Sequence, residues 1–253
     1  QFDWTFRYAG KDGKLGATDY RLITAENPLG IITRKTLADR LAALKQEAAE
    51  ATAARDKQME TLPKDVLEEK NKEIAHLNRT VERLLGLQKL MEDDIAVNGD
   101  NSSYLHGADD KVTKEFHLPV NTPVELLFRS QDVIHSAYLP HMRSQMNTVP
   151  GMTTRINLTP TITTDSMRLI TANPEFDYIL MCNKVCGVSH YNMQSPLTVE
   201  KSGAFKLWNI MLPVFDRSGG STAMATPQEA AATHTAEAGT EGAAQEQAAP
   251  ENE

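Results

Sequence analysis

The segment Cys182-Asn-Lys-Val-Cys-Gly-Val-Ser-His-Tyr-Asn-Met193 contains both cysteines of the 253-residue chain. His190 follows the second cysteine, Cys186, by four positions, and Met193 comes three positions later. Thiolate, imidazole and thioether groups are soft or borderline ligands, and together they suit copper much better than calcium or magnesium. A structural zinc site would require four strong nitrogen or sulfur ligands and has little use for a methionine. The segment therefore predicts a copper site.

A second histidine, His135, follows the apolar residues Val133 and Ile134 and is expected just after a strand. With it, the chain offers two cysteines, two histidines and a methionine as one coherent set of copper ligands. A mononuclear blue-copper site needs only one cysteine beside two histidines and a weak axial methionine. The second cysteine therefore favours two metal ions.

Three other interpretations compete with a dinuclear site. Cysteines four positions apart could form a disulfide, which is the ordinary expectation in a secreted chain. The spacing of positions 182, 186, 190 and 193 also fits one face of a helix, although Gly187 and its valine and serine neighbours are mediocre helix formers. A copper chaperone with a Cys-x-x-x-Cys loop is the third, but it would not need His190 and Met193 directly after the second cysteine.

With these residues the chain resembles subunit II of the haem–copper cytochrome c oxidases, in the domain that carries the dinuclear copper centre CuA. The family signature is a histidine after a strand, followed by Cys-x-x-x-Cys-x-x-x-His-x-x-Met. The resemblance covers residues 1–8 and roughly 112–210. It implies two copper ions held by six groups: bridging thiolates of Cys182 and Cys186, one imidazole each from His135 and His190, and weak axial ligands from Met193 and the backbone carbonyl of Lys184.

The resemblance implies the electron-entry subunit of a membrane-bound oxidase, with its copper domain on the periplasmic or intermembrane-space side. Electrons would come from a c-type cytochrome and pass to haem in the catalytic subunit I, where oxygen is reduced to water. No nucleic-acid partner is expected. A copper-delivery or scaffold protein of the oxidase assembly is the alternative. The copper domain of a nitrous-oxide reductase also shares the motif, but it would require a large histidine-rich propeller that is absent from this sequence.

Three positions depart from the family pattern. Phe2 stands where the family usually has the tryptophan through which electrons enter, and Arg7 stands at a usually acidic position, so Trp4 is a substitute candidate for the entry point. Lys184 replaces a glutamate that usually binds magnesium. An ammonium group donates hydrogen bonds and cannot coordinate a cation, so no magnesium bound by the Lys184 side chain is expected.

Short strand-like segments separated by turns predict a Greek-key β-sandwich or barrel, for which the resemblance implies the cupredoxin version. Residues 1–8 alternate aromatic and polar side chains, the period of a half-buried strand. Further strands are expected at 112–118, 124–128, 153–159, 167–171, 176–181 and 196–200, and a short helix or final strand at 203–212. His141, Met142, Met146 and Met152 are expected to be packing or surface residues. The short apolar runs 22–23 and 30–32 are expected to pair with each other or to clamp onto the barrel.

The sequence changes character at Thr36, the expected N-cap of a helix over residues 36–60 with a leucine stripe. After Pro63, a second helix is expected from about 64 to 92. Apolar residues follow the a and d positions of a heptad repeat, with the polar Gln88 at one of these positions. Its apolar members are Ile74, Leu77, Val81, Leu84 and Met91. Residues 36–97 therefore predict an antiparallel helical hairpin inserted between residues 1–35 and 98–215 of the copper domain. Two interpretations stay open: a self-contained hairpin, or a docking arm for another subunit, respiratory complex or electron donor.

The net charge of −8 is unevenly distributed along the chain. Residues 36–100 have 10 basic and 14 acidic side chains, and residues 216–253 have one and seven, whereas residues 101–215 have nine of each. The copper domain is therefore neutral, and net charge says little about its docking face. No run approaches the roughly 18 apolar residues that span a bilayer. We expect a membrane anchor to precede Gln1, and the low-complexity segment 216–253 to be disordered.

Overall fold

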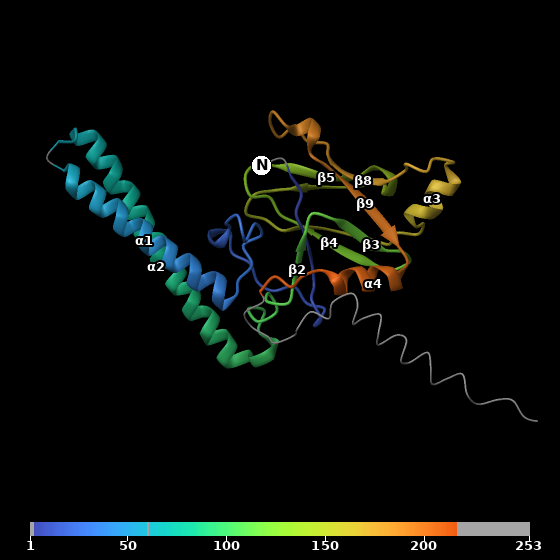
Figure 1. Ribbon diagram of the computed structural model, residues 1–253, viewed down its shortest axis with the longest axis horizontal. Coiled ribbons are helices and arrows are strands. Elements are labelled where there is room, and N and C mark those ends of the chain that lie inside the picture. Colours follow the sequence, from blue (N-terminus) through green and yellow to red (C-terminus); the bar gives the residue numbers. More distant parts are fainter. Residues whose placement is uncertain (1–2, 60, 217–253) are drawn as a thin grey trace, which may run out of the picture. The chain divides into compact units, whose positions relative to one another are not determined.

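The computed structural model describes residues 3–59 and 61–216 (Figure 1). Phe2 and nearly all of the segment predicted to be a disordered tail lie outside the described residues. In the described part of the chain, no helix is long and apolar enough to cross a membrane.

The main sheet has five strands in the order β3-β9-β8-β5-β6, so two of its four neighbouring pairs, β3–β9 and β8–β5, join strands that are not consecutive in the chain. Its strands are β3 (Phe116–Pro119), β9 (Gln194–Glu200), β8 (Tyr178–Cys182), β5 (His135–Leu139) and β6 (Ser144–Thr148). The β3–β9 pair is parallel and the other pairs are antiparallel. Two antiparallel pairs accompany this sheet: β4 (Val124–Phe128) with β7 (Thr154–Leu158), and β1 (Phe6–Tyr8) with β2 (Lys111–Thr113).

The sheet folds as it does because apolar residues recur at every second position of its central strands. In β8, Tyr178, Leu180 and Cys182 are buried, and in β9 the buried residues alternate with more exposed ones. Side chains from β4 and β7 pack against the same core, which gives it a second layer. The predicted cupredoxin-like β-domain is confirmed.

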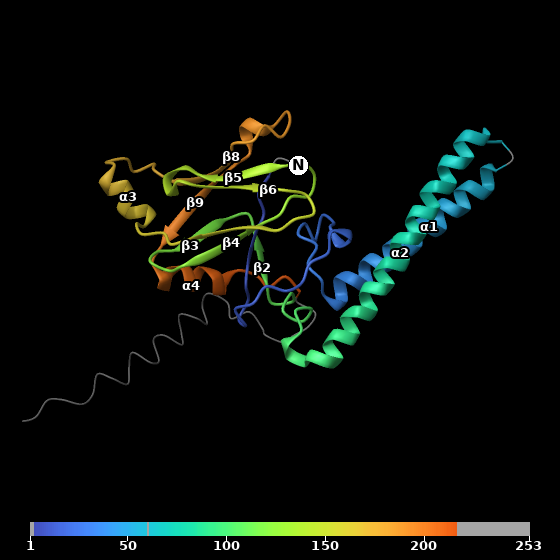
Figure 2. The same cartoon turned by 180° about the vertical axis from the view of Figure 1, so that it is seen from behind.

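The hairpin consists of α1 (Arg34–Gln58) and α2 (Lys64–Asn98), which lie side by side in Figures 1 and 2. This confirms the predicted pair of helices, but Thr36 is not the N-cap. Thr33 is the cap, because its hydroxyl accepts a hydrogen bond from the Thr36 backbone N–H at 3.1 Å while the Thr36 hydroxyl accepts one from the Thr33 N–H at 2.9 Å. This reciprocal capping box satisfies two N–H groups of the helix start.

The packing inside the hairpin departs from the predicted heptad at one place. After Leu84, the next buried residue of α2 is Leu87, and Gln88 is only half-buried. The buried stripe then continues through Met91 and packs against the leucines of α1. Leu22 and Ile32, from the apolar runs 22–23 and 30–32, belong to this hairpin core, so for these two residues the expected possibility of clamping onto the barrel was wrong.

Two further segments differ from expectation. Residues 167–171 do not form a strand but belong largely to helix α3 (Thr164–Ile170), because the Thr163 hydroxyl caps the N–H of Ser166 at 3.2 Å. The first strand is shorter than residues 1–8 and begins at Phe6. Residues 202–211 form a helix, α4 (Ser202–Met211), the first of the two predicted possibilities. Four 3₁₀ turns complete the described elements: η1 (Tyr20–Leu22), η2 (Gly99–Asn101), η3 (Pro140–Met142) and η4 (His190–Asn192).

Candidate metal centre

The pairing of β5 with β8 brings the distant histidine to the cysteine loop. In the antiparallel register, Ala137 lies opposite Cys182, the last residue of β8. His135 is two residues earlier, so it lies beside the loop that continues β8 rather than beside the strand itself. His135 is the first residue of β5, not a residue that follows a strand as predicted.

The two cysteines and His135 form one cluster. One ligand atom from each of the three side chains lies within 4.8 Å of the other two. Among the described residues, this is the cluster of histidine, cysteine or acidic side chains that is close enough to hold a metal ion. The two sulfur atoms are 3.8 Å apart, and both cysteines are free. A disulfide requires about 2.05 Å between the sulfurs, so this geometry is that of two separate thiols.

The remaining candidate ligands lie around the same two sulfur atoms. The backbone carbonyl oxygen of Lys184 is 3.1 Å from the Cys182 sulfur. The Cys186 sulfur is 3.5 Å from Nδ1 of His190 and 4.0 Å from the Met193 sulfur. The helical alternative for this loop is wrong, because only residues 190–192 form a short 3₁₀ turn and Gly187 has a φ of 142°, a conformation that favours glycine.

The ring of His135 is poised to use one nitrogen as a ligand. Its Nε2 is 2.8 Å from Oδ1 of Asp132, and its Nδ1 is buried without a hydrogen-bond partner in the described structure. A histidine that binds a metal usually donates its other N–H to a carboxylate, which fixes the tautomer and the ring orientation. The unsatisfied Nδ1 is therefore the atom that a metal would complete.

Two titratable groups shape the electrostatics of the cluster. Partial burial would raise the pKa of Asp132, but hydrogen bonds, including the one from His135, outweigh it and hold that pKa well below its usual range. Burial and the neighbouring Cys182 sulfur raise the pKa of the Cys186 thiol. Two adjacent thiolates beside a carboxylate require positive charge to be stable. The donor set thus fits soft cations such as copper.

The loop is held at its base and exposed at its tip. The backbone oxygen of Met193 accepts hydrogen bonds from the Cys182 N–H at 3.0 Å and from Nε1 of Trp4 at 3.5 Å. Val185, Val188 and Tyr191 are among the most exposed apolar side chains of the described chain. Beside them, a hollow of about 510 Å³ is lined by residues of the loop and of the segment before His135: Asp132, Val133, Ile134, Pro150, Lys184, Val185 and Cys186.

The other residues considered from sequence lie elsewhere. The His141 ring packs against the rings of Phe176 and Tyr178, with centroids 5.1 and 5.5 Å away, and Met142 and Met146 pack against the sheet core. Met152 is exposed. They are packing and surface residues, as predicted.

One functional feature, the hydrogen-bond partner of His135, was missed by sequence reasoning. Asp132 stands three residues before His135, and an acidic residue near a candidate ligand is too common to identify a hydrogen-bond partner. Arg7, which departs from the family pattern, has a structural role here: its guanidinium pairs with the fully buried carboxylate of Asp110 and donates to the backbone oxygen of Gly16 at 2.8 Å.

Comparison with known proteins supports this picture. Residues 88–202 match the family model described as cytochrome c oxidase subunit II, periplasmic domain. The chain is 27% identical over 209 residues to the alternative cytochrome c oxidase subunit 2 of Bradyrhizobium diazoefficiens, a match that covers 82% of this chain and 47% of the relative. It is 31% identical over 98 residues to cytochrome c oxidase subunit 2 of Thermostichus vulcanus, covering 38% of this chain and 26% of that one.

The chain thus spans about half the length, or less, of these curated relatives. The longer match necessarily extends beyond residues 88–202. Among solved structures, the periplasmic domain of subunit II of cytochrome oxidase from Bradyrhizobium japonicum superimposes with a TM-score of 0.32 and 22% identity, over 39% of this chain and 62% of that one. Residues 88–202 therefore match the periplasmic domain of cytochrome c oxidase subunit II, and the chain is similar to subunits of this kind.

Proposed function

We propose that this chain is the electron-entry subunit of a membrane-bound haem–copper oxidase and carries a dinuclear CuA centre. It would accept electrons one at a time from a c-type cytochrome and pass them to haem in the catalytic subunit I, where oxygen is reduced to water. Residues 1–35 and 98–215 would form the copper domain on the periplasmic side, and residues 36–97 would be an inserted hairpin.

The proposal rests on one arrangement: the sulfur atoms of Cys182 and Cys186 lie together, and four further donor groups surround them. The donors would be the side chains of His135, Cys182, Cys186, His190 and Met193 and the backbone carbonyl of Lys184. Copper ions bound there would supply one-electron redox chemistry. The protein's own part is to hold the donors still, because a site that moves little between oxidation states needs little reorganisation for electron transfer.

The described contacts provide that rigidity. His135 and Cys182 are fixed by the β5–β8 pairing, and the two ends of the loop are joined by the hydrogen bond between the Cys182 N–H and the Met193 oxygen. Met193 is buried, which excludes water from that side. The exposed tip of the loop, with Val188 and Tyr191, is the surface that we assign to an electron-transfer partner, because such contacts are small and transient.

The usual magnesium site should be altered in this chain. The atom of Lys184 that faces the Cys182 sulfur is its backbone oxygen, so the change from glutamate leaves a candidate copper ligand in place. Its ammonium cannot replace the carboxylate as a ligand of magnesium. We propose that no magnesium is bound by this side chain, and metal analysis with anomalous scattering at this position would test it.

The decisive experiment is to load the chain with copper, count the copper per protein, and record its visible and electron-paramagnetic-resonance spectra. Two copper ions sharing one unpaired electron, with a seven-line hyperfine pattern, would support the CuA assignment. One copper with a four-line pattern, or a colourless product with a disulfide between Cys182 and Cys186, would refute it. Either result would favour the alternative, a copper-delivery or scaffold protein of the oxidase assembly.

A further inference from the structure

One face of helix α2 is unusual for a surface that stays in contact with water. Five exposed residues recur with a spacing of three and four positions, which places them on one side of the helix: Arg83, Gly86, Leu90, Asp93 and Val97. We call this set the outer stripe. The residues that α2 buries in the hairpin core, such as Leu84 and Met91, follow a different face. Leu90 is 61% exposed and Val97 is 83% exposed, so the hairpin core does not use the outer stripe.

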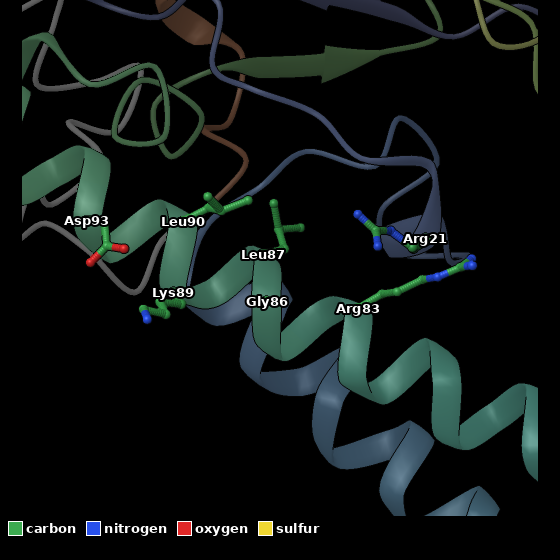
Figure 3. Close-up of a pocket in the computed structure, with 7 residues that line it drawn as sticks. All are labelled: Arg21, Arg83, Gly86, Leu87, Lys89, Leu90 and Asp93. Carbon is green, nitrogen blue, oxygen red and sulfur yellow. The ribbon is translucent and has the colours of Figure 1, made fainter.

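Gly86 is the second observation. A glycine in the middle of a helix is about 1 kcal/mol less favourable than alanine, and such a residue usually makes room for a close neighbour. Among the described residues there is none, because a Cβ at Gly86 would meet no atom within 4 Å. A hollow of about 520 Å³ lies there instead (Figure 3), lined by Arg21, Arg83, Gly86, Leu87, Lys89, Leu90 and Asp93. The space is therefore open to a group from outside the chain.

The order of residues in the outer stripe is self-complementary. Gly86 and Leu90 lie two positions on either side of Gln88, and Arg83 and Asp93 lie five positions on either side. A second α2 placed antiparallel, with a two-fold axis at Gln88, would therefore set the partner's Leu90 over Gly86 and the partner's Asp93 opposite Arg83. Each contact would occur twice, as a two-fold interface requires.

From this self-complementarity we propose that the outer stripe of α2 binds the same stripe of a second copy of this chain. The charges agree with this occupant, because neither Arg83 nor Asp93 forms an ion pair with any described residue of its own chain. Lys89 lies close to the two-fold axis, at the edge of the hollow. It opposes the contact by repelling the partner's Lys89 unless both ammonium groups point to solvent. The contact is small, so the association is weak and grows with concentration.

The inference concerns the hairpin and goes beyond the proposed electron-transfer function. It is tested by sedimentation of the full chain over a wide concentration range, with a reductant present so that Cys182 and Cys186 cannot link chains. The unaltered chain is expected to pass from monomer to dimer. R83E and D93R should each raise the dimer dissociation constant about tenfold or more, because each places like charges opposite one another. The double variant R83E/D93R should recover most of the affinity, since it restores the opposite charges.

Two further variants make the result specific. K45E, an equal charge change at an exposed position of α1, should leave the dimer unaffected. G86Q, which fills the hollow, should abolish the dimer while the circular-dichroism helix signal stays. A chain that stays monomeric at every concentration would overturn the proposal. So would single reversals without effect, a double reversal that fails to restore the dimer, or binding of this face to another oxidase subunit in place of a second copy.

Discussion

The hydrogen bond between Asp132 and His135 offers the sharpest test of how the site is held. Replacing Asp132 by alanine removes the only described partner of the His135 Nε2 atom, at 2.8 Å. Without the hydrogen bond at Nε2, nothing keeps the proton on Nε2 and leaves Nδ1 unprotonated for a metal. The buried ring can then rotate or change tautomer. Loss of such an outer partner typically lowers metal affinity 10- to 100-fold, which corresponds to about 1.4 to 2.7 kcal/mol.

The assay is competition for copper against a chelator of known affinity, followed by the optical spectrum of the loaded chain. Asp132→Asn should be milder than Asp132→Ala, because the amide oxygen can still accept the hydrogen bond from Nε2. Asp165→Ala, an exposed carboxylate on α3, is the matched control and should behave like the unaltered chain. If Asp132→Ala binds copper as tightly as the control, the carboxylate does not position His135 and the reasoning is wrong.

Three further predictions concern stability. Leu84→Ala removes a side chain that is completely buried in the hairpin core and should lower the free energy of unfolding by about 2 to 5 kcal/mol, measured by urea titration. Gly86→Ala should raise it by about 0.4 to 1 kcal/mol at a concentration where the chain is monomeric; a loss of stability would show that an unseen neighbour fills the hollow. Trp4→Phe removes the long hydrogen bond to the Met193 oxygen and should cost about 1 kcal/mol or less, with the copper spectrum unchanged; a changed spectrum would show that Trp4 shapes the loop.

The loop that we propose to bind copper could be singled out from sequence because its candidate donors are local. Cys182, Cys186, His190 and Met193 lie within twelve residues, and few other sites use that combination of donors. The pairing of His135 with them depends on the β5–β8 register, which the sequence supports only through strand-like pattern. The link from Asp132 to His135 was out of reach, since it depends on how the chain bends before β5.

The errors elsewhere have a common physical origin. A short apolar run such as 167–171 fits a strand or a helix equally well, and the side-chain cap at Thr163 decides it. In α2 the heptad pattern pointed to Gln88, yet the more apolar Leu87, three positions after Leu84 and four before Met91, is the buried residue. Leu22 and Ile32 were apolar enough for any core, and only the chain path shows that they pack at the hairpin.

The two proposals can fail independently because the structure separates their supports. In the described chain, the hairpin core and the sheet core are distinct clusters with no residue in common. Substitutions without shared partners have nearly additive effects. Charge reversal at Arg83 or Asp93 should therefore change association while copper content and spectrum stay constant, and Asp132→Ala should do the opposite. A hairpin variant that altered the copper spectrum would show coupling between the two cores and would contradict the division of roles argued from their contacts.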